Sequence, residues 1–132
     1  MKNIEVVAAI IIHDRKILCV QRGYNKLDYI SKKFEFPGGK MESGETQTAA
    51  IVREIWEELR MEIVPIREFL IVEHQYPDFF ITMHSLICTC CDPTLTLTEH
   101  LSFKWLSLVE LNKLDWAEAD KPIVNELINR NL

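Results

Sequence analysis

The sequence has no apolar run that approaches the roughly 20 residues a helix needs to cross a bilayer. It also lacks an excess of positive charge, because 15 lysines and arginines stand against 20 acidic residues and the formal net charge is -5. Binding to DNA, RNA or an anionic membrane is driven by lysine and arginine neutralising phosphates, so no nucleic-acid polymer and no membrane is expected as a partner. A small phosphorylated ligand stays compatible, since local basic residues or bound cations can meet it inside an acidic protein.

Zinc and disulfide patterns are absent as well. The four cysteines are Cys19, Cys88, Cys90 and Cys91. They include one C-x-C spacing and no second metal-like pair, so we expect reduced cysteines packed in strands. The apolar residues 4–12 carry no cleavage-like segment and run directly into a turn at residues 13–15, which predicts a buried strand rather than a signal peptide. These features predict a cytoplasmic protein.

The chain length of 132 residues suits one domain, and no repeat, linker or low-complexity tract divides it. We therefore expect a single domain over residues 1–132. Apolar and β-branched runs predict strands at residues 4–12, 16–21, 35–36, 66–75, 79–91 and 103–106. Helical spacing of apolar residues predicts a main helix at residues 46–59, and capping signals predict a short helix from residue 107 and a last one from residue 120. This order indicates an α+β fold with a mixed sheet rather than repeated βαβ units.

The main expected helix carries three acidic side chains on one face. Glu54, Glu57 and Glu58 are spaced i, i+3 and i+4, so their carboxylates project together. A solvated acidic face is one interpretation. A divalent-cation site is the other, because like charges repel unless a cation lies among them, and Mg²⁺ prefers oxygen ligands shared with phosphates. Gly38 and Gly39, which precede the helix and allow close backbone approach, favour the second interpretation.

The segment that begins at Gly39 resembles the Nudix box, G-x5-E-x7-R-E-U-x-E-E-x-G-U, in which U is a bulky apolar residue. Gly39 is followed by five residues and Glu45, then by seven residues and the run Arg53-Glu54-Ile55-Trp56-Glu57-Glu58-Leu59-Arg60-Met61. Every defined position matches except Arg60, which stands where the family has glycine. Residues 35–40, 76–78 and 105–108 resemble the MutT-type branch, so the similarity covers most of the chain.

The resemblance implies a Nudix fold, in which a mixed β-sheet is sandwiched between α-helices (α/β/α). It implies an enzyme that hydrolyses a nucleoside triphosphate to a monophosphate and pyrophosphate, with Mg²⁺ as cofactor, Mn²⁺ as a substitute, and a role in sanitation of the nucleotide pool. The implied metal ligands are Gly39, Glu54, Glu57, Glu58 and Glu99. Arg53 would hold the loop and the carboxylates in place, and Glu45 would either orient Arg53 or join the cluster. The general base would be Glu54 as first choice and Glu99 as second.

The one departure from the box lies at position 60. The family glycine is expected to be a left-handed helix stop. A non-glycine residue there costs about 1 kcal/mol, so Arg60 either bears that conformation or the helix ends differently. Arg60 contributes no ligand, and we expect catalysis to survive.

The candidates for substrate binding are Arg22, Lys40, Phe79 and Asp120. The guanidinium fork of Arg22 suits phosphate oxygens, although an edge-strand arginine in solvent is the alternative, and the resemblance places Lys40 against the phosphates. Phe79, with Tyr76 and Phe80, is a candidate for stacking on a base, although alternating strand residues are more often core.

Asp120 bears on the identity of the base. MutT-like enzymes that act on 8-oxo-dGTP have asparagine in an Ala-Asn-x-Pro setting, whereas this chain has Ala119-Asp120-Lys121-Pro122, which is similar to the CTP pyrophosphohydrolases of the branch. An ionised carboxylate only accepts hydrogen bonds and the cytosine amino group donates them. A cytosine or modified pyrimidine nucleotide is therefore the expected substrate. Capping of the last helix is the other interpretation of Asp120.

Three other functions stay open: an 8-oxo-dGTP sanitising hydrolase, a Nudix hydrolase of another nucleoside diphosphate derivative, and a non-catalytic Nudix ligand sensor. The intact set of three glutamates counts against the sensor, and the short chain counts against many sugar-nucleotide enzymes. The histidines are scattered along the chain, and none is given a metal role. A monomer and a homodimer are both compatible with the sequence.

Overall fold

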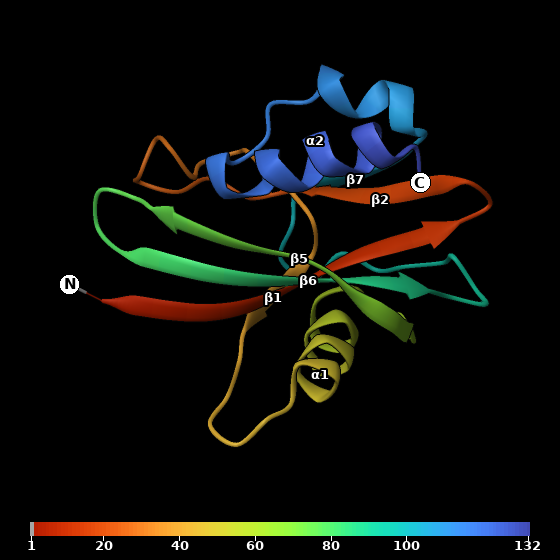
Figure 1. Ribbon diagram of the computed structural model, residues 1–132, viewed down its shortest axis with the longest axis horizontal. Coiled ribbons are helices and arrows are strands. Elements are labelled where there is room, and N and C mark those ends of the chain that lie inside the picture. The colour runs from red at the N-terminus through yellow and green to blue at the C-terminus, as the bar shows by residue number, and fades with distance from the viewer. Residues whose placement is uncertain (1) are drawn as a thin grey trace.

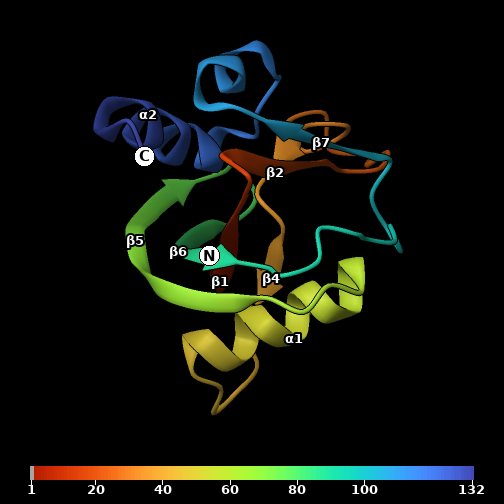
Figure 2. The ribbon, with the colours of Figure 1, turned by 90° about the vertical axis from the view of Figure 1, so that its right-hand side faces the viewer.

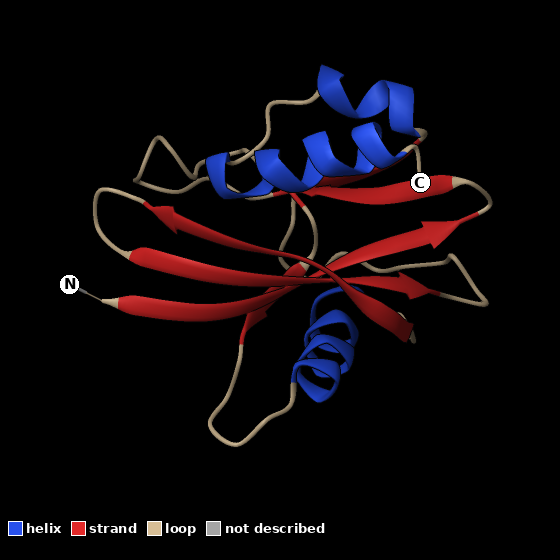
Figure 3. Cartoon of the chain, viewed as in Figure 1, coloured by secondary structure: helices blue, strands red, loops and turns tan. Residues whose placement is uncertain are grey.

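The computed structural model describes residues 2–132 and shows a twisted mixed β-sheet between helices (Figure 1, Figure 3). In chain order the elements are β1 (Asn3–His13), β2 (Lys16–Gln21), β3 (Phe34–Glu35), β4 (Gly38–Lys40), α1 (Gln47–Leu59), β5 (Val64–Gln75), β6 (Phe80–Thr89), β7 (Ser102–Leu106), the 3-10 helices η1 (Leu108–Lys113) and η2 (Glu118–Asp120), and α2 (Lys121–Arg130). The prediction of an α+β fold with a mixed sheet is confirmed. No helix in the described residues is long and apolar enough to span a membrane.

β1 is the central strand of the sheet. It runs parallel to β6 from the pair Asn3–Phe80 to the pair Ile12–Thr89. Its other edge pairs with β4 at residues 6–8 and with β2 at residues 12 and 13, both antiparallel. β2 pairs further on with β7 and β3, and β5 pairs with the far edge of β6. β1 and β2 therefore separate beyond their turn, and β4 takes the edge of β1 that β2 leaves.

Alternate residues of β1 belong to two different cores. The odd-numbered residues from 7 to 11 share a core with the buried face of α1, which is Ala50, Ile51, Ile55 and Leu59. Residues 8 and 10 share the other core with α2, which contributes Ile123, Val124 and Leu127. Figures 1 and 2 show α1 on one side of the sheet and α2 with η1 on the other. A strand covered on both faces explains why this segment reads as a continuous apolar run.

Local signals explain where several elements begin and turn. Asp14 and Arg15 join β1 to β2 with φ of 53° and 64°, as a two-residue hairpin turn requires. The hydroxyl of Thr46 accepts a hydrogen bond from the Ala49 N–H at 3.1 Å, so the predicted N-cap of α1 is confirmed. The predicted capping box between Ser107 and Glu110 is also present, and it opens η1.

The C-terminus of α1 shows how the chain accommodates arginine at the family's glycine position. Arg60 adopts the left-handed conformation, with φ 53° and ψ 36°, and its N–H donates to the Trp56 carbonyl at 3.0 Å. The Arg60 guanidinium also lies over the Trp56 ring, 5.7 Å from the centroid. The helix therefore ends as a glycine stop would, and Arg60 bears the conformational cost.

Replacing Arg60 with glycine is expected to raise the free energy of unfolding by up to about 1 kcal/mol, because glycine adopts this conformation without steric cost. The lost contact with Trp56 subtracts little, since 5.7 Å is close to the outer limit of about 6 Å for a cation–π contact. Thermal unfolding should show a gain of about 3–5 °C. Arg60→Ala is the matched control, because it removes the same contact and keeps the strain. Equal melting temperatures for the two variants would contradict this account.

The expectation for the cysteines was partly wrong. All four thiols are free, and Cys19 and Cys88 are buried within strands, where burial raises the pKa of each to about 12. β6 ends at Thr89, however, so Cys90 and Cys91 follow the strand, and Cys91 is exposed. The apolar run continues past the last ladder partner, which is why the sequence overstated the length of this strand.

Candidate active site

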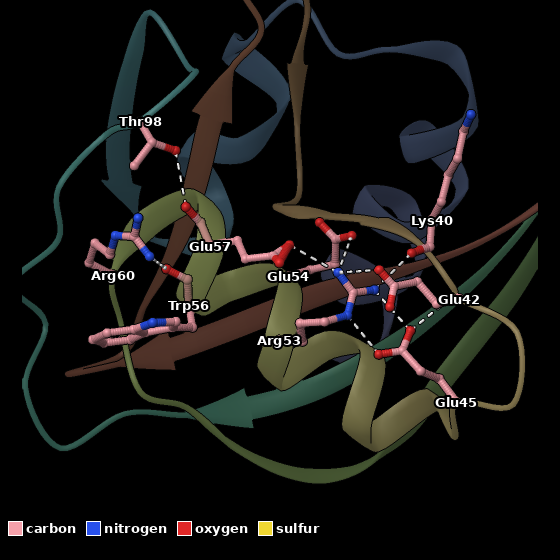
Figure 4. Close-up of polar contacts among 9 residues, drawn as sticks. All are labelled: Lys40, Glu42, Glu45, Arg53, Glu54, Trp56, Glu57, Arg60 and Thr98. Atoms are coloured by element: carbon pink, nitrogen blue, oxygen red, sulfur yellow. Dashed lines mark hydrogen bonds and ion pairs between the residues drawn. The ribbon is translucent and has the colours of Figure 1, made fainter.

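Arg53 is the centre of a cluster of charged side chains on α1 and the loop before it (Figure 4). Its guanidinium donates to both carboxylate oxygens of Glu45, at 2.6 and 2.9 Å. Nη1 donates to Glu54 at 3.1 Å and to Glu57 at 3.0 Å, and Nη2 donates to the Lys40 carbonyl at 3.1 Å. One side chain thus links the loop of residues 40–45 to two acidic residues of the helix.

Glu45 orients Arg53 rather than joining the acidic residues on α1. Its Oε1 also accepts the Glu42 N–H at 2.7 Å, which closes the loop on itself. The Arg53 guanidinium and then the Glu42 N–H hold the pKa of Glu45 down at about 2. Glu45 therefore stays ionised at any physiological pH and holds the arginine fork in a single direction.

The two glycines of β4 allow two close approaches. A Cβ on Gly38 would overlap the Val7 carbonyl of β1, so glycine lets β4 lie flat against that strand. A Cβ on Gly39 would overlap the carboxylate of Glu54. The backbone at Gly39 and the Glu54 side chain therefore lie against each other, as expected if both face one ligand.

Glu99 reaches the site because the loop before β7 is tied to the end of α1. The Thr96 N–H donates to the Leu59 carbonyl at 2.9 Å, and the Thr98 N–H donates to the Glu58 carbonyl at 3.1 Å. The Thr98 hydroxyl also donates to Glu58, at 2.9 Å. These bonds satisfy carbonyls that a helix end leaves unpaired. They place Glu99 in the wall of the cavity that Glu54 and Glu58 also line.

Glu58 is a buried carboxyl among other carboxyls. Burial raises its pKa to about 9, with further contributions from Glu35, Glu54 and Glu99. Its Oε1 is buried and has no hydrogen-bond partner in residues 2–132. In that same range, no three acidic, histidine or cysteine side chains converge closely enough as they stand to hold a metal ion. An unpaired buried oxygen in a region of concentrated negative charge fits a divalent cation, which would draw the neighbouring carboxylates inward.

A cavity of about 770 Å³ lies beside these carboxylates. That volume is in the range of small-molecule sites. α1 contributes Glu54, Glu57 and Glu58, whereas the side of the sheet covered by α2 contributes Tyr76, Ala119 and Asp120. Apolar side chains of β1 and β6 line the wall as well, and these are Ile4, Val6, Val7, Ala8, Ile81 and Met83. The cavity thus combines an acidic part with a largely apolar part.

Asp120 lies in the cavity wall and does not cap α2 with its side chain. It is 3% exposed, and its Oδ1 accepts the Phe36 N–H at 3.0 Å. No helix N–H is bound by the side chain, so the capping interpretation is wrong. Burial raises the pKa of Asp120 well above its ordinary value, as does the charge of Glu35, against the opposing effect of the Phe36 N–H and Arg22.

The structure also places Glu35 and His100 in the site, and the sequence analysis gave neither a role. Arg22 lies 3.4 Å from Glu35, whose other oxygen lies 3.2 Å from His100 Nε2. His100 Nε2 is in turn 3.9 Å from Glu58. Glu35 lies within the run Glu35-Phe36-Pro37-Gly38-Gly39-Lys40 that carried the family resemblance, so the signal was available. His100 carried no signal, because only the fold brings it beside Glu35.

The other predicted substrate residues have different positions. Arg22 and Phe79 line the cavity, and Phe79 packs against Tyr76 with ring centroids 5.1 Å apart. Lys40 also lines the cavity, and its amino group points away from the Arg53 cluster in Figure 4. Phe80 is not among the residues of the described chain that form the cavity wall. It is therefore not brought to the site with the other two aromatic candidates.

Comparison with known proteins places the chain. Residues 2–127 match the NUDIX domain family. The chain belongs to the Nudix family. It is 31% identical over 127 residues to the 8-oxo-dGTP diphosphatase of Escherichia coli strain K12, which covers 96% of this chain and 98% of that relative. It is 36% identical over 124 residues to the CTP pyrophosphohydrolase of the same strain, which covers 94% of this chain and 90% of the relative.

The solved structures agree with the sequence relatives. The solution structure of the E. coli ORF135 protein matches with a TM-score of 0.83 at 35% identity, over 99% of this chain and 92% of that chain. This Nudix protein is therefore a nucleotide pyrophosphohydrolase, and the predicted Nudix fold and enzyme class are confirmed. Nudix hydrolases generally need a divalent metal and act on small nucleotides. The two relatives act on different nucleotides by name, so the family does not settle the substrate.

Proposed function

We propose that this Nudix enzyme hydrolyses nucleoside triphosphates to a monophosphate and pyrophosphate with Mg²⁺, and that it favours cytosine nucleotides. The observation that carries the cytosine preference is Asp120, a buried carboxyl in the wall of the cavity. One of its oxygens is held by the Phe36 N–H, and the other has no hydrogen-bond donor in the described residues. That second oxygen is available to a base.

The acidic part of the cavity suits a hard cation. Glu54, Glu57 and Glu58 supply oxygen ligands on one face of α1, with Gly39 and Glu99 beside them. Mg²⁺ is our proposed occupant, with Mn²⁺ as a substitute, because both prefer oxygen donors. A bound divalent cation would neutralise charge on the phosphates and lower the pKa of a bound water. Glu57 would leave Arg53 to take part, while the paired bonds to Glu45 keep the guanidinium in place.

The chain's own groups orient water and substrate. We propose that water attacks the β-phosphorus, that its oxygen forms the new bond, and that the bond to the nucleoside monophosphate breaks. Glu54 is the first candidate to accept the water proton and Glu99 the second, since both line the cavity. Arg53 positions Glu54 without touching substrate. Arg22 and Lys40 line the same cavity and are the proposed phosphate contacts.

The charge of Asp120 connects base preference to pH. An ionised carboxylate only accepts hydrogen bonds, whereas a protonated one both accepts and donates, as an asparagine amide does. Because burial raises the pKa of Asp120, its ionised form is favoured when a donor such as the cytosine amino group binds it. The proposed preference for cytosine should therefore strengthen as pH rises through the pKa of Asp120.

A panel of CTP, dCTP, 5-methyl-dCTP and 8-oxo-dGTP, assayed for pyrophosphate release with and without Mg²⁺, tests the proposal. A cytosine nucleotide should have the highest kcat/KM, and its advantage should grow from pH 6 to pH 9. Asp120→Asn is the matched variant, because it keeps the shape and cannot titrate. It should lose the pH-dependent part of the preference. A tenfold or greater preference of the wild-type enzyme for 8-oxo-dGTP at every pH would overturn the proposed substrate.

Hydrolysis of 8-oxo-dGTP is the second candidate function, and two observations favour it. The E. coli 8-oxo-dGTP diphosphatase is similar over 98% of its own length. The raised pKa of Asp120 also favours the protonated form, which offers the same donor and acceptor as the asparagine of that branch. The same panel separates the two candidates, since 8-oxo-dGTP would lead at low pH.

A further inference from the structure

The hydroxyl of Tyr76 is a buried donor that the protein does not use. Tyr76 is 6% exposed and lines the cavity. Its oxygen accepts the Ala119 N–H at 3.0 Å. In the chain from residue 2 onward, no atom accepts the hydroxyl proton in return. A buried hydroxyl left without an acceptor costs free energy, so the wall of the cavity holds a donor that a ligand can satisfy.

The ring of Tyr76 is held rigidly, so the direction of this donor is set before a ligand binds. Tyr29 stacks on the ring at 5.4 Å, His74 meets its edge at 4.5 Å, and Phe79 packs at 5.1 Å. Tyr29 is itself anchored by a short hydrogen bond to Asp78 in the turn that follows Tyr76. A phenol proton stays close to the ring plane. Because the Ala119 N–H approaches one side of the oxygen, the proton points to the other.

The donor also stays protonated and lies beside the proposed base-reading carboxyl. Burial raises the pKa of Tyr76 to about 12, and the nearby charges of Asp120, Glu35 and Glu118 act in the same direction. The Ala119 N–H that fixes the hydroxyl belongs to the residue next to Asp120 in the chain. The wall therefore offers an acceptor on Asp120 and a donor on Tyr76 within one short stretch.

We propose that Tyr76 is a specificity-determining residue whose hydroxyl donates to N3 of a cytosine while Asp120 accepts from the adjacent amino group. This inference rests on the proposed function, and it assigns the second contact with the base. Cytosine presents a donor amino group beside the acceptor N3, which matches the order of acceptor and donor on the wall. Tyr76 touches the substrate and takes no part in breaking the phosphoanhydride bond.

The test is a substrate–variant cycle that uses dCTP and 3-deaza-dCTP, in which a C–H replaces N3. Wild-type enzyme should turn over dCTP with a kcat/KM about tenfold higher, the size of one buried neutral hydrogen bond. In Tyr76→Phe the two substrates should be equal within about twofold. Tyr29→Phe is the control, because it removes a neighbouring hydroxyl that bonds Asp78 outside the cavity, and it should keep the wild-type ratio.

The outcomes separate the hydroxyl contact from a structural role. If loss of the Ala119 contact merely disturbed Asp120, both substrates would fall by the same factor in Tyr76→Phe, and the unchanged ratio would overturn the inference. Equal turnover of the two substrates by wild-type enzyme would overturn it too, and this arm needs no variant to fold. Failure of wild-type enzyme to hydrolyse dCTP with Mg²⁺ is a different result, because it removes the proposed function first.

Discussion

Replacing Glu58 with glutamine is expected to lower the metal-dependent turnover of the best triphosphate substrate by at least about 100-fold. Glutamine keeps the shape of the side chain and removes the charge that a divalent cation needs. Glu58 is the buried carboxyl whose Oε1 has no partner in the described residues, so its charge has no other counter-ion there. Steady-state kinetics at saturating Mg²⁺ would measure the loss.

The same substitution should stabilise the metal-free protein. Burial and neighbouring carboxylates raise the pKa of Glu58 from 4.5 to about 9. The folded state thus holds a proton that the unfolded chain releases, so stability is fully present below about pH 4.5 and is lost as pH rises towards 9. Glu58→Gln lacks this loss and should melt above wild type at pH 8 without metal. Added Mg²⁺ should raise the melting temperature of wild type and not of the variant.

Glu62→Gln is the matched control, because Glu62 is an exposed carboxyl just beyond the end of α1. It should keep wild-type turnover and a wild-type response to Mg²⁺. A Glu58→Gln enzyme with both properties intact would show that the metal is held without Glu58.

Replacing Gly39 with alanine is expected to reduce activity by about 100-fold with little loss of stability. The new methyl group would overlap the Glu54 carboxylate. Because a carboxylate is the mobile end of its side chain, it can move away at small cost to folding, but it then leaves the position that β4 and Arg53 define. Turnover and thermal unfolding, measured on the same preparation, would show this separation.

Gly44→Ala should give the opposite result. Gly44 has φ of 82° and no atom within 4 Å of an added Cβ, so alanine there is strained and meets nothing. Stability should fall by about 1 kcal/mol, while activity stays at the wild-type level. Loss of activity in both variants, or in neither, would contradict the proposed contact between Gly39 and Glu54.

Much of the site could be predicted from spacing, because a helix converts sequence separation directly into a shared face. Glu54, Glu57 and Glu58 face the cavity from α1, as the i, i+3, i+4 spacing indicates. The pattern around Gly39 was equally informative, since glycine is needed where backbone meets a side chain closely. The length of the last part of β6 was less predictable, because an apolar run does not show where ladder partners end.

Contacts over long sequence distances were beyond the sequence. Glu35 and His100 are 65 residues apart, and neither spacing nor composition connects them. Asp120 had two compatible interpretations, and the choice between them depended on the Phe36 N–H, which lies 84 residues away in the chain. In both cases the partner is supplied by strand pairing, which brings β3 between β2 and the segment before α2.

The sequence by itself determined the family, the enzyme class and the acidic face of α1, because these follow from local spacing along one helix and its preceding loop. Only the tertiary structure decided that Glu45 orients Arg53, that Glu58 is buried without a partner, and that Tyr76 holds a free hydroxyl beside Asp120. Burial and the direction of a hydrogen bond depend on which distant segments pack together. The physical reason is that desolvation and pairing are properties of the folded neighbourhood, which no local pattern encodes.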